Sequence, residues 1–307
     1  MIYDYIIIGA GASGSPLANR LSEDLNKTVL LLEAGPDLTE LSRLPEDVRD
    51  GADAIKASKG DSLWEYFAKG NSYQEGQMSL PRGKIMGGST AVNGMIWIRG
   101  TPEDFDGWVE MGNDKWSYKH ILPFFRKIET DQNFGGDFHG TEGPIPVRRF
   151  PQQDWMPSIK AFHQACLNYG FSATPDMNLP DSSGVGPRAV NQLGGVRMST
   201  ALTYLQPIRH RMNLVLRGDV LVRKVLFQGT TAIGVEVESG GEIFEINGRE
   251  VILSAGAVGS PCILLHSGIG PSESLKNLGI PVVKDLPGVG EHLSDHPSVL
   301  VYYKLKE

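Results

Sequence analysis

The sequence has few of the features that would point to a disulfide scaffold, a membrane protein or a nucleic-acid partner. Two cysteines among 307 residues give neither a disulfide framework nor a four-cysteine metal site. No apolar run approaches the ~18 residues of a membrane span. The net charge is −7 and Lys and Arg are not clustered, which argues against a nucleic-acid partner. A strand pattern begins within a few residues of Met1, so we expect no signal peptide and a cytoplasmic location.

Glycine, by contrast, is abundant. The chain has 37 glycines, about 12% of its residues against a usual ~7%. This excess predicts many places where the backbone turns tightly or approaches another group closely. The hydrophobic fraction of 40% and the charged fraction of 21% are ordinary for a globular protein. The length allows one large domain or two ordinary ones.

The first thirty-five residues have the pattern of a nucleotide-binding βαβ unit. An apolar run at 5–8 predicts a buried parallel strand, and a G-x-G-x-x-G loop follows it at 9–14. A second apolar strand is expected at 28–32, directly before Glu33. Between them we expect a helix from near Gly14, because apolar residues recur on one face, at Leu17, Ala18, Leu21 and Leu25.

Each part of this unit has a physical role toward a dinucleotide. Gly9 allows the tight turn, Gly11 lets the backbone approach a pyrophosphate, and Gly14 lets helix and strand pack closely. The free N–H groups at the helix start then face the phosphates. Glu33, about 20 residues past Gly14, can accept hydrogen bonds from an adenosine ribose. An acid at this position disfavours a 2′-phosphate and fits FAD and NAD equally well.

A second glycine-dense stretch, 83–95, places small residues beside a Gly-Gly pair. It indicates that the backbone approaches something bulky, although a loop packed under a helix is an equally simple reading of the pattern alone. Farther along, periodicity predicts helices at 104–108, 116–129 and 158–169. We expect a small antiparallel meander made of strands at 214–216, 220–227 and 233–238. Two more strands are expected at 242–246 and 250–254, and the second of them enters a glycine turn at Gly256.

Other candidate sites are weaker. His292, Asp295 and His296 could suggest a metal, but prolines and glycines around them argue against a helix and favour a loop beside a cofactor. Ser89 and Ser254 lack the G-x-S-x-G context of a serine hydrolase.

The remaining cysteine, histidine and tryptophan side chains have simple structural interpretations. Cys262 lies in an apolar helix pattern and is expected to be a small core residue. No paired acid or ligand spacing accompanies five histidines, which we expect at the surface or satisfied in the core: His120, His139, His163, His210 and His266. Three tryptophans are interpreted as packing residues: Trp97, Trp108 and Trp116.

Taken together, three stretches closely resemble the glucose-methanol-choline (GMC) flavin oxidoreductases. They are 9–14 with 33–35, 83–93 continuing to 106, and 256–270. The resemblance covers nearly the whole chain, because linking segments match as well, at 138–140, 143–144, 197–201, 204–205, 288–290 and 295–297. Met86 is one small departure, since the family more often has a branched aliphatic residue there.

The resemblance implies FAD as the cofactor and assigns residues to it. Glu33 would hold the adenosine ribose, and the backbone of Val222 would meet the adenine. The pyrophosphate would lie against Gly9, Gly11, Ala12, Ser13 and Gly14. The ribityl chain and flavin ring would lie along Gly83, Met86, Gly87, Gly88, Ser89, Asn93, Gly94 and Met95. Further contacts are expected at Ala34, Trp64, Ala255, Gly256, Asp295 and His296. The attachment should be non-covalent, because Val92 stands where some members carry a linking His.

The fold implied is α/β: a Rossmann-like FAD-binding domain of GMC type with the beginning of a second, substrate-binding domain. We place the FAD domain at 1–145 and 190–296, and assign 146–189 and 297–307 to the substrate domain, whose remainder lies outside this chain. Residues 138–147 would cross between the two, and 298–304 would form a strand.

The function implied is oxidation of an alcohol CH–OH group by hydride transfer to flavin N5. The family's catalytic His lies in a C-terminal part beyond the matched region, so no residue here is assigned catalysis, and neither His292 nor His296 is offered as a substitute. The expected partners are that C-terminal portion, or an equivalent second chain, and a small alcohol. Two alternatives stay open: a flavin-dependent lyase or photodecarboxylase on the same scaffold, and a flavin-binding subunit without chemistry of its own.

Overall fold

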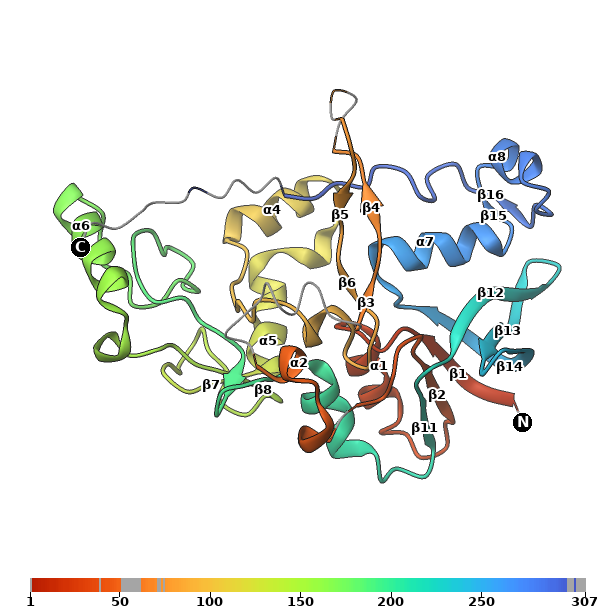
Figure 1. Cartoon of the computed structure of the whole chain (residues 1–307), viewed down its shortest axis with the longest axis horizontal. Helices are drawn as coiled ribbons and strands as arrows, with labels where there is room; N and C mark the ends of the chain where they lie inside the picture. Colours follow the sequence, from red (N-terminus) through yellow and green to blue (C-terminus); the bar gives the residue numbers. More distant parts are fainter. Residues whose placement is uncertain are drawn as a thin grey trace.

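A six-stranded sheet forms the centre of the computed structural model, which describes residues 2–38, 40–50, 62–70, 73, 75–296 and 301. The strand order is β11-β2-β1-β14-β13-β12 (Figure 1). Neighbours from β11 to β14 run parallel, whereas β12, β13 and β14 are antiparallel. The strands are β1 (Ile2–Ile8), β2 (Val29–Leu32), β11 (Leu214–Arg217), β12 (Leu221–Gln228), β13 (Thr231–Ser239) and β14 (Glu242–Leu253).

Both faces of this sheet are covered, as a continuous apolar strand requires. All four residues of β2 are buried. Helix α1 (Gly14–Leu21) and a short π-helical turn at Ala201–Leu205 cover one face. Ala18 of α1 belongs to the same apolar cluster as Ile7 and Leu31 of the sheet. Helix α7 (Gly256–His266) covers the other face. Its Ile263 packs there in one apolar cluster with side chains from β1, β2, β12 and β13. The predicted α/β fold is confirmed, including the parallel pairing of β1 with β2.

Two strand predictions were wrong. The segment at 214–216 belongs to the edge of the parallel sheet, paired with β2, because an apolar tripeptide fits either kind of sheet. The two strands expected around 247 are one strand, β14. Gly248 does not break it: a Cβ there would lie 2.5 Å from Cδ1 of Ile6, so this glycine makes room for a core side chain. Helix α1 is also shorter than expected, and Leu25 lies beyond its end, exposed.

The middle of the chain forms helices and short ribbons beside the sheet (Figure 1). The three predicted helices are confirmed with shifted ends, as α4 (Pro102–Glu110), α5 (Tyr118–Ile128) and α6 (Pro157–Tyr169). Two antiparallel ribbons join β3 (Leu63–Trp64) to β6 (Arg82–Gly83) and β4 (Phe67–Ala68) to β5 (Met78–Ser79). The remaining elements are α2 (Glu46–Arg49), β7 (Glu129–Asp131), β8 (Ile145–Val147), β9 (Gln192–Leu193), β10 (Val196–Arg197), β15 (Ile269–Gly270), α8 (Ser272–Asn277) and β16 (Lys284–Asp285), with single 3-10 turns at Leu41–Arg43, Gly88–Ala91, Asp114–Trp116, Gln152–Asp154 and Gln206–Ile208.

The expected crossover at 138–147 contains β8, which pairs in parallel with β7. The domain boundaries at 145/146 and 189/190 stay a prediction. Apart from Val301, the strand expected at 298–304 lies outside the described residues. In the described ranges, no helix is both long and apolar enough to cross a membrane.

Candidate cofactor site

The three glycine-rich stretches meet at the end of β1. Gly9 has φ +95°, and a Cβ there would lie 2.6 Å from the carbonyl oxygen of Ser254. A Cβ on Gly14 would lie 1.9 Å from the carbonyl oxygen of Gly9 and 2.6 Å from Oγ of Ser254. These distances allow only glycine, and they confirm a tight turn at Gly9 and close packing at Gly14. Because Ser254 directly follows β14, the end of that strand lies against the loop between β1 and α1.

The second stretch crosses the first. A Cβ on Gly88 would lie 2.8 Å from Cα of Gly11, so these two backbones face each other directly. The N–H of Gly87 donates to the carbonyl oxygen of Ala10 at 2.9 Å. Thr200 also binds this loop, since its Oγ1 donates to the carbonyl oxygen of Gly11 at 3.3 Å. Segments nearly 200 residues apart in the chain therefore pack together and form one surface, the floor of the site.

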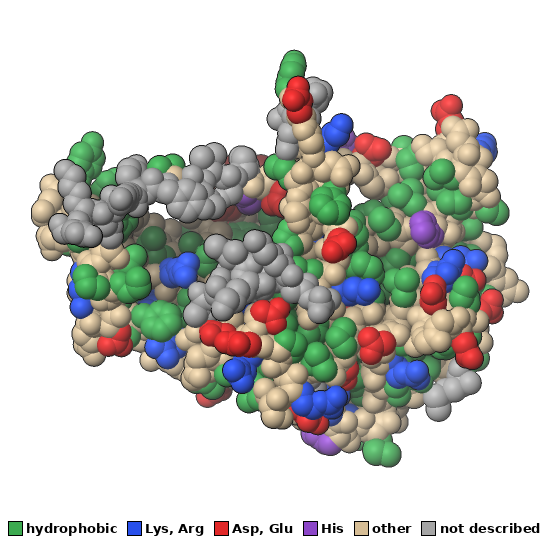
Figure 2. Space-filling view, viewed as in Figure 1, with side chains coloured by type: hydrophobic (Ala, Val, Ile, Leu, Met, Phe, Trp, Pro, Cys, Tyr) green, Lys and Arg blue, Asp and Glu red, His purple; other side chains and the backbone are tan. Residues whose placement is uncertain are grey.

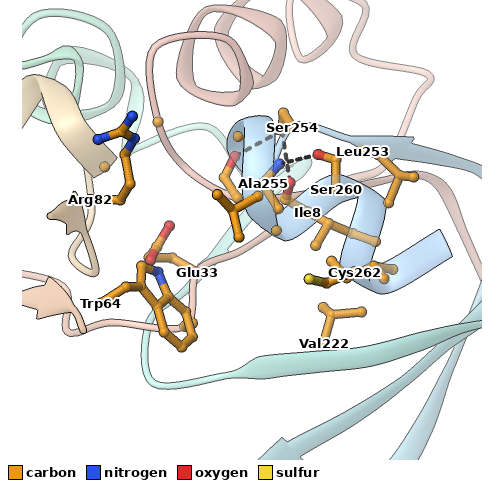
Figure 3. A pocket seen from close by; sticks show the side chains of 18 of the residues that line it. Ile8, Glu33, Trp64, Arg82, Val222, Leu253, Ser254, Ala255, Ser260 and Cys262 are labelled. Atoms are coloured by element: carbon orange, nitrogen blue, oxygen red, sulfur yellow. Dashed lines mark hydrogen bonds between the residues drawn. The ribbon is translucent and has the colours of Figure 1, made fainter. Parts of the chain in front are cut away.

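Above this floor lies a cavity of about 630 Å³, within the usual range for small-molecule and cofactor sites. It opens at the carboxyl ends of β1, β2 and β14, where open parallel sheets bind ligands. Figure 3 shows Glu33, Trp64 and Arg82 on one side of it, with Val222 and Cys262 on another. The predicted cofactor residues that line it are Gly9, Gly11, Ala12, Ser13, Glu33, Ala34, Trp64, Gly83, Gly88, Ser89, Val222, Ala255 and Gly256.

One end of the cavity offers backbone donors. Within the described chain, the N–H groups of Gly11, Ala12 and Ser13 have no hydrogen-bond partner in the protein. They precede α1, whose first turn carries no acidic side chain. Free N–H groups at a helix start attract anions, so this end suits a phosphate.

Another part of the cavity lining is aromatic. The rings of Trp64 and Tyr66 stack at 5.8 Å with an interplanar angle of 9°. Nζ of Lys84 lies 4.8 Å from the centre of the Trp64 ring, which adds a cation–π contact. Tyr66 and Trp64 both line the cavity, so this part of its lining is aromatic.

Glu33 is 5% exposed, and its carboxylate serves the loops as well as the cavity. Oε2 accepts the N–H of Ala10 at 2.9 Å, and Oε1 accepts the N–H of Gly35 at 3.0 Å. Burial raises the pKa of the Glu33 carboxyl, and these backbone hydrogen bonds oppose that shift. The carboxylate therefore braces both glycine turns while keeping lone pairs for a ligand hydroxyl.

Replacing Glu33 by Ala should weaken FAD binding by ~1.5–3 kcal/mol, the size expected when a hydrogen bond to a charged group is lost. The fold should also lose stability, because Ala10 and Gly35 lose their acceptor. Glu33→Gln is the matched control, since it keeps an amide oxygen for one of the two N–H groups. Fluorescence titration with FAD and urea unfolding separate the two effects. Equal FAD affinity in all three proteins would mean that the ribose is held elsewhere.

Eight predicted residues do not line the cavity. Gly14 lies under the loop, and Met86 is 2% exposed within the core beside α1. Asp295 reaches the cavity indirectly, through a 3.1 Å salt bridge with Arg82. The others are Gly87, Asn93, Gly94, Met95 and His296. Met95 has φ 58°, and its N–H donates to Oδ1 of Asn93, so this turn is shaped by its own side chains. The assignment of all these residues to a cofactor stays a prediction.

The cavity also contains residues that sequence reasoning missed. They come mainly from strand ends and from the first turns of α7: Ile8, Leu32, Tyr66, Arg82, Val220, Leu221, Arg223, Leu253, Ser254, Ala257, Val258, Gly259, Ser260, Cys262, Ile263 and His266. The rule that ligands bind outside the carboxyl ends of parallel strands could have found the strand ends. The expectation that Cys262 is a core residue was wrong, because it is exposed and faces the cavity. Helix α7 is apolar around its whole circumference, so the sequence does not reveal which side is open.

The weaker candidates have structural roles here. The hydroxyl of Ser254 donates to the carbonyl oxygens of Ile8 and Gly9, both at 2.9 Å. Oγ of Ser89 accepts the N–H of Gly83 at 3.1 Å. Both serines thus hold backbone, and neither has the geometry of a nucleophile. Of the possible metal ligands near the end, Asp295 is paired with Arg82.

His139 differs from the expectation that it lacks a paired acid. Its ring lies within hydrogen-bond distance of Glu129, Asp131 and Asp176. Trp97 is likewise more than a packing residue, since its Nε1–H donates to Glu129 at 2.7 Å. These partners come from separate segments, so their spacing along the chain gives no signal.

The comparisons with known proteins agree with this architecture. The profile of the family described as GMC oxidoreductase matches residues 3–298. The chain belongs to the GMC oxidoreductase family. Among curated GMC relatives, a GMC-type oxidoreductase of uncharacterised function from Rhodococcus erythropolis is 40% identical over 98% of this chain and 60% of its own length. An oxygen-dependent choline dehydrogenase from Photobacterium profundum is 39% identical over 98% of this chain and 53% of its own length.

Solved structures share this fold. Pyridoxine 4-oxidase from Mesorbium loti is 32% identical with a TM-score of 0.86, over 93% of this chain and 55% of that one. An FAD-dependent oxidoreductase from Chaetomium thermophilum is 28% identical with a TM-score of 0.84, over 93% of this chain and 51% of that one. The chain therefore spans between half and three-fifths of the length of these relatives. The family resemblance predicted from the three motifs is confirmed.

Proposed function

We propose that this chain is the FAD-binding portion of an oxidoreductase that oxidises the CH–OH group of an alcohol. The observation that carries the proposal is the cavity at which all three glycine-rich stretches meet, with free N–H groups at one end and an aromatic wall beside it. Relatives and solved neighbours of the same fold include choline dehydrogenase, pyridoxine 4-oxidase and an FAD-dependent oxidoreductase, which supports the cofactor and the reaction class.

The residues present suit FAD from end to end. The N–H groups of residues 11–13 would hold the pyrophosphate, and Glu33 the adenosine ribose. The backbone at Val222 would meet the adenine, and the loop from Gly83 to Ser89 would lie along the flavin side. The lack of a side chain at Gly88 lets the two loops meet at the base of the cavity, since a Cβ there would lie 2.8 Å from Cα of Gly11.

Bound FAD would supply an acceptor for a hydride at N5. The contribution of this chain is to bind and orient the cofactor and to shape one wall of the site. Proton removal from the substrate hydroxyl requires a base within hydrogen-bond reach, and we assign that role to no residue of this chain. We propose that it comes from a C-terminal portion of the same protein, or from an equivalent second chain.

The sheet itself supports a further polypeptide partner. Strand β13 pairs with β14 only as far as Asn247, whereas β1 pairs with β14 as far as Leu253. The N–H of Ser254 points to β1, so by alternation the N–H and C=O groups of Arg249, Val251 and Leu253 point to the other edge. No strand of the described chain pairs with that edge.

Two helices support the same conclusion. Helix α7 is apolar all round, and among its residues only Ile263 is buried, while much of its open side lines the cavity. It lies on the sheet face opposite α1, so a right-handed crossover from β14 through α7 leads to the open edge. Helix α6 has no buried residue, although its Ile159, Phe162 and Tyr169 are apolar and at least half exposed. Figure 2 shows hydrophobic side chains over that end of the molecule.

FAD should be released completely by acid precipitation. Val92 has no nucleophilic atom at the position where some family members attach the flavin. The supernatant should therefore carry all of the yellow colour, and the colourless pellet should show no flavin fluorescence on a denaturing gel. Colour retained in the pellet would contradict non-covalent binding.

The test of the reaction is anaerobic mixing in the dark. The FAD-loaded chain is mixed with choline, pyridoxine and simple primary alcohols, first alone and then with the C-terminal portion added in trans. We expect no bleaching of the flavin by the chain alone, because the base is missing, and bleaching with one of the alcohols once the partner is present. Full reduction by the chain alone would contradict the need for a partner. A partner that restores no reduction with any alcohol would favour the lyase, photodecarboxylase or subunit alternatives.

A further inference from the structure

A buried cluster of charged side chains lies outside the cavity, between β7, β8 and two loops. His139 is at its centre and is 3% exposed. Its Nδ1 lies 3.0 Å from Oε1 of Glu129 and 3.1 Å from Oδ2 of Asp131. Its Nε2 lies 2.7 Å from Oδ2 of Asp176. Both ring nitrogens therefore face carboxylate oxygens.

Two arginines complete the cluster. Arg99 pairs with Glu129 at 2.5 Å, and its NH1 donates to the carbonyl oxygen of Phe138. Arg149 binds both oxygens of Asp131, at 3.0 and 2.8 Å, and reaches Asp176 at 2.6 Å. The three carboxylates and two guanidinium groups leave one negative charge uncompensated if the imidazole is neutral. Burying an uncompensated charge costs several kcal/mol.

The hydrogen-bond geometry gives the same answer as the charge count. A neutral imidazole has one N–H and one lone pair. Whichever tautomer formed, its lone pair would point at a carboxylate oxygen, at Asp176 on one side or at Glu129 and Asp131 on the other. Only the doubly protonated ring donates on both sides.

Glu129, Asp131 and His139 are also close enough together to resemble a metal site. Their ligand atoms are already engaged: Arg99 and the indole N–H of Trp97 donate to Glu129, and Arg149 occupies both oxygens of Asp131. A cation added there would meet two guanidinium groups, so the site suits a protonated ring better than a metal.

We propose that His139 is an imidazolium at physiological pH and that it holds the segment 97–99, which follows the glycine-dense loop 83–95, against residues 146–189. It acts through Glu129, which holds Trp97 and Arg99, the continuation of the loop that ends at Met95. On its other side the ring holds Asp176, which Arg149 fixes in turn. His139 is thus a positioning residue that joins the two parts expected to form the FAD-binding and substrate domains. This role rests on the proposed function only for the naming of those parts.

The titration behaviour fits this role. Burial by itself would lower the pKa of His139, but hydrogen bonds to Asp131, Asp176 and Glu129 outweigh it and raise the pKa to about 10. The groups that face the ring are these three acids, with Arg99 and Arg149 behind them and the Phe134 ring at 5.8 Å. The histidine is therefore charged throughout the physiological pH range.

The test is nitrogen-15 NMR of the chain labelled at histidine, titrated from pH 6 to 10. We expect both ring nitrogens of His139 to stay protonated at pH 7 and to titrate only at the alkaline end. In Asp176→Asn, which removes one acid, the titration should move down by at least one pH unit. His139→Gln should lower the melting temperature by ~6–15 °C, whereas the surface control His210→Gln should not.

Two results would overturn the proposal. One is a neutral His139 at pH 7, with one ring nitrogen carrying the shift of an unprotonated nitrogen. The other is a stoichiometric transition metal in the purified chain that is lost in His139→Gln. Neither result depends on FAD binding or on turnover, so failure here is distinguishable from failure of the proposed function.

Discussion

Replacing Gly14 by Ala should strongly weaken FAD binding and destabilise the nucleotide-binding unit. The new Cβ would lie 1.9 Å from the carbonyl oxygen of Gly9 and 2.6 Å from Oγ of Ser254. These atoms belong to the backbone at the end of β1 and to a side chain tied to it, so they cannot move aside without shifting helix α1. Overpacking of this kind costs about 3 kcal/mol or more. A shift of the loop should weaken FAD binding at least ~100-fold, equivalent to about 3 kcal/mol.

Gly11→Ala is the matched control, from the same loop. A Cβ there would meet only Cα of Gly88, at 3.8 Å, which is an ordinary contact. Stability should stay within ~0.5 kcal/mol of the parent, while FAD affinity should fall about tenfold, because the methyl group takes room beside the proposed pyrophosphate position. Urea unfolding and FAD titration of both variants test the pair. Unchanged stability in Gly14→Ala would contradict the packing described here.

The second large effect is expected at Arg197, which is 1% exposed. Its Nε donates to the carbonyl oxygen of Asn93, and its NH1 lies within 3.0 Å of the carbonyl oxygens of Asp47, Val48 and Ala91. One side chain therefore ties residues 91–93 of the glycine-dense stretch 83–95 to helix α2. Burial lowers the pKa of this guanidinium, and the negative charges of Asp47 and Asp50 oppose that shift. The four hydrogen bonds given above all go to backbone carbonyl oxygens.

Arg197→Met should lower the free energy of unfolding by about 3–5 kcal/mol, because several buried carbonyl groups lose their donor at once. FAD affinity should fall about tenfold or more as the loop loosens. The control is Arg249→Met, whose side chain is 73% exposed and forms a long 3.6 Å pair with Asp4; it should change stability by less than ~1 kcal/mol. Chemical denaturation followed at the tryptophans measures both. Equal stability of the two variants would contradict the role assigned to Arg197.

The sequence predicted well those features that depend on neighbouring residues. The unit from β1 through α1 to β2 is visible because strand, glycine turn, helix and acid follow one another within thirty-five residues. Gly9 and Gly14 have the packing positions that their spacing implied. The role of Glu33 toward an adenosine ribose stays a prediction, and its bonds to the N–H groups of Ala10 and Gly35 were not foreseen. The helices α4, α5 and α6 were likewise found from periodicity, with errors only at their ends.

The features that were missed depend on contacts between distant segments. Gly248 looked like a break between two strands, whereas it makes space for the Ile6 side chain inside one. Cys262 faces the cavity although an apolar helix gives no direction to its open side. His139 lies 10 residues from Glu129 and 37 from Asp176, so the fold alone brings this charged cluster together.

The most direct test of the central claim is a calorimetric titration of the folded 307-residue chain with FAD, repeated in the presence of ADP. We expect one FAD per chain with a dissociation constant near 1 μM or lower, equivalent to a binding free energy of about −8 kcal/mol. We also expect competition by ADP, because we propose that the pyrophosphate lies against the N–H groups of residues 11–13 and the adenosine ribose against Glu33. A chain whose circular dichroism shows the folded α/β structure but which binds no FAD, or binds it without competition from ADP, would contradict the account.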